Sequence, residues 1–452
     1  MGNLRCGIEV HVQLDTKSKI FCSCPTYGAE EPNTRTCEIC LGLPGSKPVL
    51  NKEAFNQAVK VALALNCKIN KDTFFSRKNY FYPDLVKNYQ ISQYEVPIGI
   101  NGNFENIRIR RLHLEEDPGA LVHKGSSCLI DYNRSGVPLI EIVTEPDFKS
   151  PNEVRLFLRK LITLLEYLEV YARKNEATLK ADANISTTGE RVEIKNVTGL
   201  KEIERALDYE SIRQEKTPAE IQETRRWDAQ KGKTSLMRTK ESEDDYGYIF
   251  EPDLPKFEIS NEVIQEIKSQ IPELSLDKTS RFQKEYKIKK EDAEVLASER
   301  KLADIFEKVA EKIDPELAAK WLVRDLLKIL HFNKKGLDEV NLDVKHLIEL
   351  LELFQNNKIT DKTAKETLIK LIDKPFSPKE YIEKNNLSIV SDSKNIDKLC
   401  REVIKENQSA VEDFKKGNDK SIHFLTGQVM RKSKGTANPK EVEKVLKKLI
   451  KL

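Results

Sequence analysis

The chain has 452 residues, a formal net charge of +3 at pH 7 and a charged fraction of 33%. This length is enough for two or three domains, each with its own core, and no stretch approaches the roughly 20 apolar residues that a membrane-spanning helix needs. A basic-then-apolar leader is not recognisable near the N-terminus, so we expect a cytoplasmic protein. The chain has eight cysteines, and in a reducing cytoplasm these favour bound metal over disulfides.

The first predicted element is a strand over Gly7–Leu14, where apolar and polar residues alternate strictly. Alternation with a period of two places the aliphatic side chains on one face and Glu9, His11 and Gln13 on the other. A strand that buries one face while it presents a carboxylate and an imidazole on the other is suited to a metal or catalytic site. Glu9 and His11 are therefore candidate site residues.

Four cysteines follow this strand in two pairs: Cys22 and Cys24, then Cys37 and Cys40 after twelve intervening residues. Two closely spaced pairs of thiolates suit tetrahedral zinc, and the glycines and prolines around them indicate tight turns. Buried free cysteines are the alternative. We predict a zinc knuckle over residues 20–45, and because four cysteine ligands leave no open coordination position, we expect its zinc to be structural and not catalytic.

Two basic residues and two tyrosines occur together in Arg77–Asp84, which has the sequence RKNYFYPD. Such a cluster could bind phosphate and stack a base, which makes Lys78, Tyr80 and Tyr82 candidate cofactor-binding residues. Taken alone this signal is weak, because aromatic clusters are more often part of a core.

Phosphate-binding loops of the usual kind are missing from the sequence. The segment 232–234, GKT, resembles the end of a P-loop, but Trp227 stands at the position of the required upstream glycine, and no G-x-G-x-x-G motif occurs. If the chain binds a nucleotide, we expect it to do so without a P-loop.

Three further predicted strands carry the remaining candidate catalytic acids, namely Glu115, Glu116, Glu141 and Asp182. Glu141 interrupts the apolar run 137–143, where an ionised carboxylate is costly to desolvate unless it is paired or ligates a metal. Carboxylate oxygens together with one imidazole suit Mg²⁺ or Mn²⁺ and do not resemble a catalytic zinc site. The alternative, solvated acids and a structural ion pair, stays open for the acids other than Glu141 and the Glu9/His11 pair.

Amphipathic helices dominate the chain beyond Pro255, for example at 317–330 and 344–354, after a body rich in strands and turns. The segment 374–378, KPFSP, breaks this helical region and is typical of a linker. We therefore predict the α+β class. The expected parts are an N-terminal body with a mostly antiparallel sheet over residues 1–290, an all-α domain over 291–387 and a small helical tail over 388–452.

Capping signatures mark the start of two helices, at Ser150–Glu153 and at Asn438–Glu441. The second lies in a basic tail: from residue 391 onward the sequence has 15 Lys and Arg against 9 Asp and Glu, a net charge of +6. Its basic cluster is the segment 431–434, RKSK. This charge favours contact with nucleic acid. The alternative is that the basic residues form a solvated helical face that only aids solubility.

Longer motifs occur in the segments Gly7–Leu14, Cys22–Gly45, Arg77–Asp84, His113–Gly119, Asp131–Asp147, Gln222–Asp228, Glu251–Pro255, Gly427–Met430 and Lys434–Pro439. In these motifs the chain resembles, over essentially its whole length, the B subunit of the tRNA-dependent Asp/Glu amidotransferase. No room exists for the large inserted domain of the related archaeal subunit. One departure is Pro118, where the family usually has alanine, and it puts only the local turn in doubt.

The resemblance implies a two-step transamidation that uses ATP and Mg²⁺. The side-chain carboxylate of Asp on tRNA-Asn, or of Glu on tRNA-Gln, is phosphorylated by ATP, and ammonia then displaces the phosphate. The implied Mg²⁺ ligands are Glu9, His11, Glu116 and Glu141, with Glu115, Asp182 and Lys78 nearby. The resemblance also implies a cradle-like N-terminal body, with tRNA contacts made by the helical domain and the tail.

The sequence lacks a Ser/Gly-rich amidase segment and a Cys/His pair in a glutaminase-like context. Ammonia must then come from a partner, which the resemblance implies to be an amidase-type glutaminase, the A subunit, bridged by a small C subunit in a heterotrimer. A zinc-containing RNA-binding scaffold without catalysis is the alternative function. ATP hydrolysis that depends on misacylated tRNA would distinguish the two, because a scaffold should show none.

Overall fold

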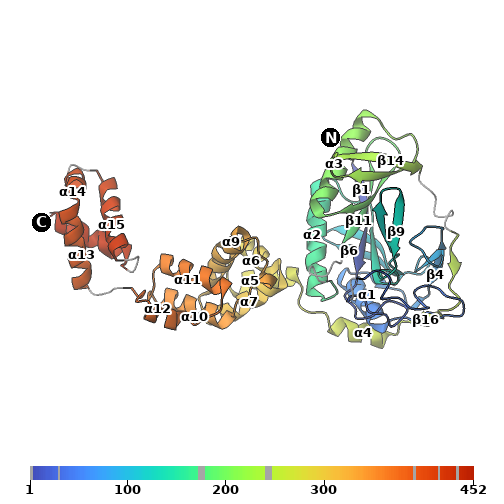
Figure 1. Cartoon of the computed structure of the whole chain (residues 1–452), viewed down its shortest axis with the longest axis horizontal. Helices are drawn as coiled ribbons and strands as arrows, with labels where there is room; N and C mark the ends of the chain where they lie inside the picture. Colours follow the sequence, from blue (N-terminus) through green and yellow to red (C-terminus); the bar gives the residue numbers. More distant parts are fainter. Residues whose placement is uncertain are drawn as a thin grey trace. The chain divides into compact units, whose positions relative to one another are not determined.

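The computed structural model describes residues 4–28, 31–171, 179–239, 247–389, 393–415, 418–433 and 437–451 (Figure 1). The chain forms two compact units, Met1–Leu274 and Ser275–Leu452. The first unit combines a sheet with helices and the second is helical, which confirms the predicted α+β class. The three-part division predicted from the sequence stays a prediction. No helix among the described residues is long and apolar enough to cross a membrane.

A twelve-stranded sheet forms the framework of the first unit within the described residues. In spatial order its main strands are β14 (Lys233–Thr239), β13 (Glu223–Asp228), β12 (Val192–Thr198), β11 (Lys180–Ser186), β1 (Arg5–Gln13), β10 (Pro138–Thr144), β7 (Ile107–Glu116), β5 (Tyr89–Ser92), β4 (Ser76–Asn79) and β15 (Ile249–Phe250). Beside this path, β6 (Gly99–Phe104) pairs with β7 and with β2 (Lys68–Ile69). Neighbouring strands are antiparallel except for the parallel pair β12 and β13, so the predicted mostly antiparallel sheet is confirmed.

Smaller elements complete the first unit. Two short sheets pair β3 (Asp72–Thr73) with β16 (Phe257–Glu258), and β8 (Ala120–Lys124) with β9 (Ser127–Asp131). The helices are α1 (Lys52–Ala64), α2 (Pro151–Tyr167), α3 (Leu200–Lys216) and α4 (Asn261–Ser269).

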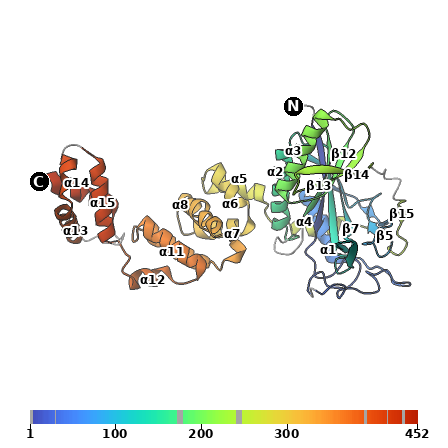
Figure 2. The same ribbon diagram turned by 45° about the horizontal axis from the view of Figure 1, so that its top comes forward.

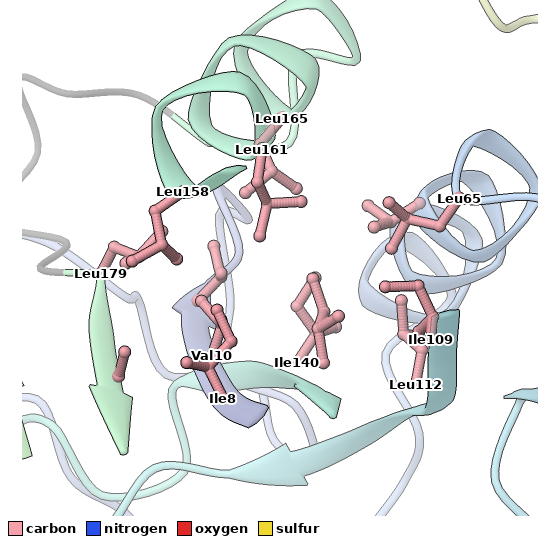
Figure 3. Close-up of a cluster of buried hydrophobic side chains, with 14 of the residues drawn as sticks. Ile8, Val10, Leu65, Ile109, Leu112, Ile140, Leu158, Leu161, Leu165 and Leu179 are labelled. Atoms are coloured by element: carbon pink, nitrogen blue, oxygen red, sulfur yellow. The ribbon is translucent and has the colours of Figure 1, made fainter. Parts of the chain in front are cut away.

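Helices cover the apolar face of the large sheet. The aliphatic side chains of β1 are buried, as the alternation predicts, and Figure 3 shows Ile8 of β1 and Ile140 of β10 packed in one cluster with leucines of α2 and with Leu65 after α1. Figure 2 shows α2 and α3 along the same side of the sheet, where α3 contacts β11 and β12. The predicted cap of α2 is present, because Ser150 Oγ accepts a hydrogen bond from the Glu153 amide at 3.3 Å. Polar residues of these strands are left to the other face.

The second unit consists of helices. Their bounds are α5 (Ser275–Glu285), α6 (Lys290–Ala297), α7 (Arg300–Ala310), α8 (Pro315–Lys320), the π-helical segment η2 (Trp321–Leu326), α9 (Leu327–Phe332), the 3₁₀ turn η3 (Leu337–Glu339), α10 (Val344–Gln355), α11 (Asp361–Asp373), α12 (Pro378–Lys384), α13 (Ser393–Glu406), α14 (Gln408–Lys415), α15 (Lys420–Lys432) and α16 (Pro439–Lys451). The helix predicted at 317–330 is found as the continuous run from α8 to α9. The last helix begins at Pro439 as its capping signature predicts, and Lys434 of the predicted basic cluster lies outside the described residues.

Two clusters of buried apolar side chains stabilise this second unit. One includes Phe306 and Trp321 and extends to α12, and the other runs from Ile396 in α13 to Ile450 in α16. The break predicted at 374–378 falls between α11 and α12, which both contribute to the first cluster. That break therefore does not separate the two clusters.

Candidate functional site

Charged side chains gather on the face of the sheet opposite the helices. His11 lies directly opposite Glu141 of β10, and Glu141 lies directly opposite His113 of β7. Glu9 lies opposite Asp182 of β11. Residues directly opposite one another in antiparallel strands share a face, and so do residues two apart in one strand. The pairing of four strands thus brings these five side chains to one surface.

Three side chains form what we call the first acid group: His11, Glu115 and Glu141. The His11 Nε2 atom lies 3.1 Å from Glu141 Oε2 and 3.6 Å from Glu115 Oε1, and one ligand atom from each residue lies within 4.8 Å of the others. Both carboxylates are buried. Two carboxylates and one imidazole at this spacing are a donor set that suits a hard divalent cation such as Mg²⁺.

Burial and charge act in opposite directions on this group. Burial lowers the pKa of His11, but the hydrogen bond to Glu141 and the charges of Glu141 and Glu115 outweigh that effect and raise the pKa to about 9. Burial raises the pKa of Glu141, yet the charge of His113 and the hydrogen bond with His11 lower it well below its usual range. Without a cation the group is therefore an ion pair, and a metal would have to displace the His11 proton, because a ligand imidazole is neutral.

The second acid group consists of Glu9, Asp182 and Glu193, whose carboxylate oxygens also lie within 4.8 Å of one another. The Lys195 ammonium lies 2.8 Å from Asp182 Oδ2 and 2.8 Å from Glu193 Oε1. Asn184 donates a hydrogen bond to Glu9 Oε1 at 3.0 Å. Burial lowers the pKa of Lys195, but the charges of Asp182 and Glu193 raise it well above its usual range. A protein side chain thus supplies positive charge to this group.

Glu116 stands apart from both groups, although it follows Glu115 directly in β7. Successive residues of a strand point to opposite faces. The Glu116 carboxylate accordingly lies 2.6 Å from Lys87 Nζ and accepts a hydrogen bond from the Ile91 amide at 2.8 Å. This acid is buried and already carries a positive partner.

The four Mg²⁺ ligands that the resemblance implies are therefore divided among three places. His11 and Glu141 belong to the first acid group, Glu9 belongs to the second, and Glu116 is paired with Lys87. Glu115, and not Glu116, lies beside His11 and Glu141, because the Glu115 side chain points to the same face of the sheet as theirs. Magnesium binding by any of these residues stays a prediction.

The predicted nucleotide-binding residues lie on β4 and the loop after it. Burial lowers the pKa of Lys78, but the charges of Glu115 and Glu141 outweigh that effect and raise it, which places the ammonium close to the first acid group. Lys78 Nζ lies 5.8 Å from the centre of the Tyr80 ring. Tyr82 is 55% exposed. Lys78 is thus a neighbour of Tyr80 and within the electrostatic influence of the first acid group, whereas Tyr82 is in contact with solvent.

Arg111 and His113 are residues of this surface that the sequence reasoning missed. Arg111 Nη2 lies 3.8 Å from Glu141 Oε1, and His113 Nε2 lies 3.7 Å from Glu115 Oε2. The signal was available, because period-two alternation places Arg111, His113 and Glu115 on one face of a strand. The same alternation places Glu193 and Lys195 on one face of β12.

A stacked pair of tyrosines stands beside the first acid group. The rings of Tyr94 and Tyr248 have centroids 4.2 Å apart and an interplanar angle of 18°, and the Arg111 guanidinium lies 5.0 Å from the centre of the Tyr94 ring. Burial, and then the charges of Glu141 and Glu115, raise the pKa of Tyr248. No local sequence signal predicts this pair, because the pairing of β15 with β4 brings Tyr248 to the site from far along the chain.

The four predicted knuckle cysteines come together as one cluster. Their Sγ atoms lie within 4.8 Å of one another, and none of them forms a disulfide. The Sγ atoms of Cys37 and Cys40 are 3.9 Å apart. Tetrahedral Zn–S bonds of about 2.3 Å imply sulfur atoms about 3.8 Å apart, so the cluster has the size of a zinc tetrathiolate site. A hydrogen bond from Cys22 lowers the pKa of the Cys40 thiol to about 5, which favours the thiolate that binds metal.

A cavity of about 100 Å³ lies between the knuckle and the sheet. Cys22 and Cys40 line it from the knuckle, Glu116 lines it from β7, and Lys87 lines it from the turn before β5. Gly42 of the knuckle faces Lys87 across this cavity: it has a φ of +64°, and a Cβ there would lie 2.2 Å from Lys87 Cγ. Glycine is therefore needed at this position both for the left-handed backbone and for space.

Comparisons with known proteins match most of the chain. Residues 4–265 match the family model described as GatB/GatE catalytic domain, and residues 304–450 match the one described as GatB domain. The chain is 43% identical over 467 residues to the B subunit of the aspartyl/glutamyl-tRNA(Asn/Gln) amidotransferase of Clostridium beijerinckii, with 98% of both chains covered. It is 44% identical over 455 residues to the protein of that name from Methanothermobacter thermautotrophicus, with 99% of this chain and 100% of the relative covered.

Proposed function

The chain belongs to the GatB family of amidotransferase B subunits, and on this premise we propose that it activates and amidates misacylated Asp-tRNA(Asn), Glu-tRNA(Gln) or both at the expense of ATP. The family match confirms the resemblance found in the sequence. It also supports a role in tRNA-dependent amide transfer. The reaction steps, the residues that perform them and the partners are what we propose here.

The observation that carries the proposal is that two acid groups and the cations Lys78, Arg111 and Lys195 share one surface of the sheet. A carboxylate is a poor electrophile and must be activated before an amine can replace its oxygen. In the proposed first step, a carboxylate oxygen of the tRNA-linked amino acid attacks the γ-phosphorus of ATP, the bond to the bridging oxygen breaks, and ADP leaves. Ammonia then attacks the acyl carbon, phosphate leaves and a proton is lost, which gives the amide.

The first acid group fits a role in this phosphoryl transfer. Glu115, Glu141 and His11 would hold Mg²⁺ there, and the bound ion would neutralise charge on the phosphates of ATP. Lys78 and Arg111 lie beside the same group and could donate hydrogen bonds to phosphate oxygens as charge moves toward the leaving ADP. Such a site would bind its nucleotide through side chains, in agreement with the absence of a P-loop motif from the sequence.

The proposal includes partners for this chain. Its relatives are named as the B subunit of their amidotransferases, and we propose an amidase-type glutaminase, the A subunit, as the source of ammonia and a small C subunit that joins the two. We further propose that the basic tail beyond residue 391, with a net charge of +6, contacts the phosphates of tRNA.

The test is release of phosphate from ATP and formation of amide by the complex of this chain with its amidase-type partner, with ammonium in place of glutamine. We expect both products with misacylated Asp-tRNA(Asn), Glu-tRNA(Gln) or both, and neither product with uncharged or correctly acylated tRNA. A scaffold that only binds RNA would release no phosphate with any of these tRNAs, and that result would overturn the proposal.

A further inference from the structure

Lys19 is a fully buried lysine beside the cysteine knuckle, with an exposed fraction of 0%. Its Nζ atom lies 3.6 Å from Cys40 Sγ and donates a hydrogen bond to the Tyr132 carbonyl oxygen at 3.3 Å. Among the described residues, no carboxylate lies within ion-pairing distance of it. A buried ammonium is costly unless a negative charge compensates it, so the location of Lys19 calls for an anionic neighbour.

A zinc tetrathiolate would be that neighbour. Zn²⁺ bound to four thiolates carries a formal charge of two negative units, and burial of that charge is unfavourable unless hydrogen-bond donors and cations surround the sulfur atoms. Cys40 is the buried member of the four. Its Sγ atom accepts a hydrogen bond from the Cys37 amide at 3.2 Å in addition to the contact with Lys19.

We propose that Lys19 is the counter-charge of the zinc knuckle and acts on the metal through Cys40. The inference rests on the proposal that the four cysteines hold zinc. Residues that donate hydrogen bonds to metal ligands orient those ligands and tune the electron density on the metal. In this role Lys19 withdraws charge from one sulfur and offsets part of the negative charge of the centre.

The rival explanation is that Lys19 only fixes the backbone at Tyr132. The structure already holds the knuckle to that loop by a main-chain hydrogen bond from the Ile20 amide to the Gly136 carbonyl oxygen at 2.9 Å, and by one that Ser135 Oγ donates to the Cys40 carbonyl oxygen at 3.3 Å. These bonds do not involve the lysine side chain. A decisive experiment must therefore report on the sulfur atoms and not on the loop alone.

The experiment compares the wild-type chain with Lys19→Met, Lys19→Gln and Ser135→Ala. Two quantities are measured on each: the zinc affinity, from competition with a chelator, and the energy of the sulfur-to-metal charge-transfer band after zinc is replaced by Co²⁺. We expect Lys19→Met to lower zinc affinity roughly 10- to 100-fold and to move the band to lower energy, because the sulfur becomes richer in electrons. Ser135→Ala, which removes a hydrogen bond to the Cys40 backbone but not to its sulfur, should change neither.

Lys19→Gln keeps an N–H donor without the charge, so its zinc affinity should fall between wild type and Lys19→Met. It also carries the test if Lys19→Met does not fold. Wild-type affinity and an unmoved band in Lys19→Gln would overturn the inference. A wild-type chain that binds no zinc would instead overturn the zinc proposal itself, so the two failures are distinguishable.

Discussion

Glu115 and Glu116 are neighbours in β7, yet their carboxylates have opposite surroundings: Glu115 Oε1 lies 3.6 Å from His11 Nε2, and Glu116 Oε1 lies 2.6 Å from Lys87 Nζ. Both side chains are buried. Their charges have different partners: the Glu115 carboxylate belongs to the first acid group, where it could bind a cation, and the Glu116 carboxylate neutralises Lys87 beside the knuckle. Equivalent substitutions at the two positions should therefore have different consequences.

We predict that Glu115→Gln weakens Mg²⁺-dependent phosphate release, while Glu116→Gln mainly destabilises the fold. The second change removes the carboxylate from Lys87, whose side chain is only 10% exposed, and loss of one partner from such a largely buried ion pair costs about 3–5 kcal/mol. Titration of phosphate release with Mg²⁺ and thermal unfolding of both variants would measure the two effects. If Glu116→Gln kept wild-type stability and lost Mg²⁺ dependence, Glu116 would belong to the metal site after all.

We predict that Glu141→Ala and His11→Ala each abolish tRNA-dependent phosphate release without loss of folding or tRNA binding. Each change removes a proposed Mg²⁺ ligand from the first acid group, whose donor atoms lie within 4.8 Å of one another. The matched control is Glu145→Gln, because Glu145 pairs with the exposed Arg110 at 2.9 Å and such surface pairs contribute at most about 1 kcal/mol. Normal phosphate release by either alanine variant would contradict the assignment, as would outright unfolding.

Loss of zinc should follow Cys37→Ser, since the knuckle would then have three thiolates. Metal analysis of the purified protein should give one zinc per chain for the wild type and less for the variant. Cys128→Ser is the control, because Cys128 is an exposed cysteine outside the cluster. Full retention of zinc by Cys37→Ser would show that the four cysteines are not the ligands.

Gly42→Ala and Gly45→Ala form a second matched pair. Both glycines have positive φ, +64° and +89°, but a Cβ at Gly42 would lie 2.2 Å from Lys87 Cγ, whereas nothing lies within 4 Å of one at Gly45. Each substitution should cost about 1–2 kcal/mol for the backbone conformation, and Gly42→Ala should cost a further 1–3 kcal/mol or so for the overlap. Urea unfolding measures the difference, and equal losses would show that Lys87 moves aside freely.

The basic tail offers a comparison between adjacent cations. Lys432 Nζ lies 2.5 Å from Glu406 Oε1 and 3.5 Å from Glu402 Oε2, whereas Arg431 has no ion pair among the described residues. Arg431→Gln should therefore weaken tRNA binding and reduce the slope of log K against log salt by about 1, and Lys432→Gln should do so less. Deletion of the tail from residue 391 should have the largest effect on both quantities. Unchanged affinity and slope after that deletion would exclude the tail from tRNA binding.

Local patterns were sufficient to predict several parts of this structure. The alternation in Gly7–Leu14 gave the central strand and its buried face, and the spacing of the cysteines gave their cluster. The capping residues Ser150 and Asn438 marked the starts of α2 and α16. Each of these features depends on residues that are close together in the sequence, so the spacing and type of those residues are enough to predict it.

The grouping of the acids could not be predicted in the same way. Alternation requires that Glu115 and Glu116 point in opposite directions, but which of them faces His11 depends on the register of β7 against β10. The division of the acids into two groups depends on β1 lying between β10 and β11, and the approach of Tyr248 depends on β15. These pairings join segments that are far apart in the chain.

The central position of β1 also sets the order in which the protein can be assembled during synthesis. Glu9 and His11 leave the ribosome first, but the first acid group is complete only with Glu141 of β10 (Pro138–Thr144), and the second only with Glu193 of β12 (Val192–Thr198). Pairing across such sequence distances is slow and carries a loop-closure cost. A nascent chain that ends before β10 therefore has neither group complete, and one that ends before β12 has the first group without the second. Fragments that end before β10 should accordingly be unable to bind a cation at either group, even though they contain the complete knuckle.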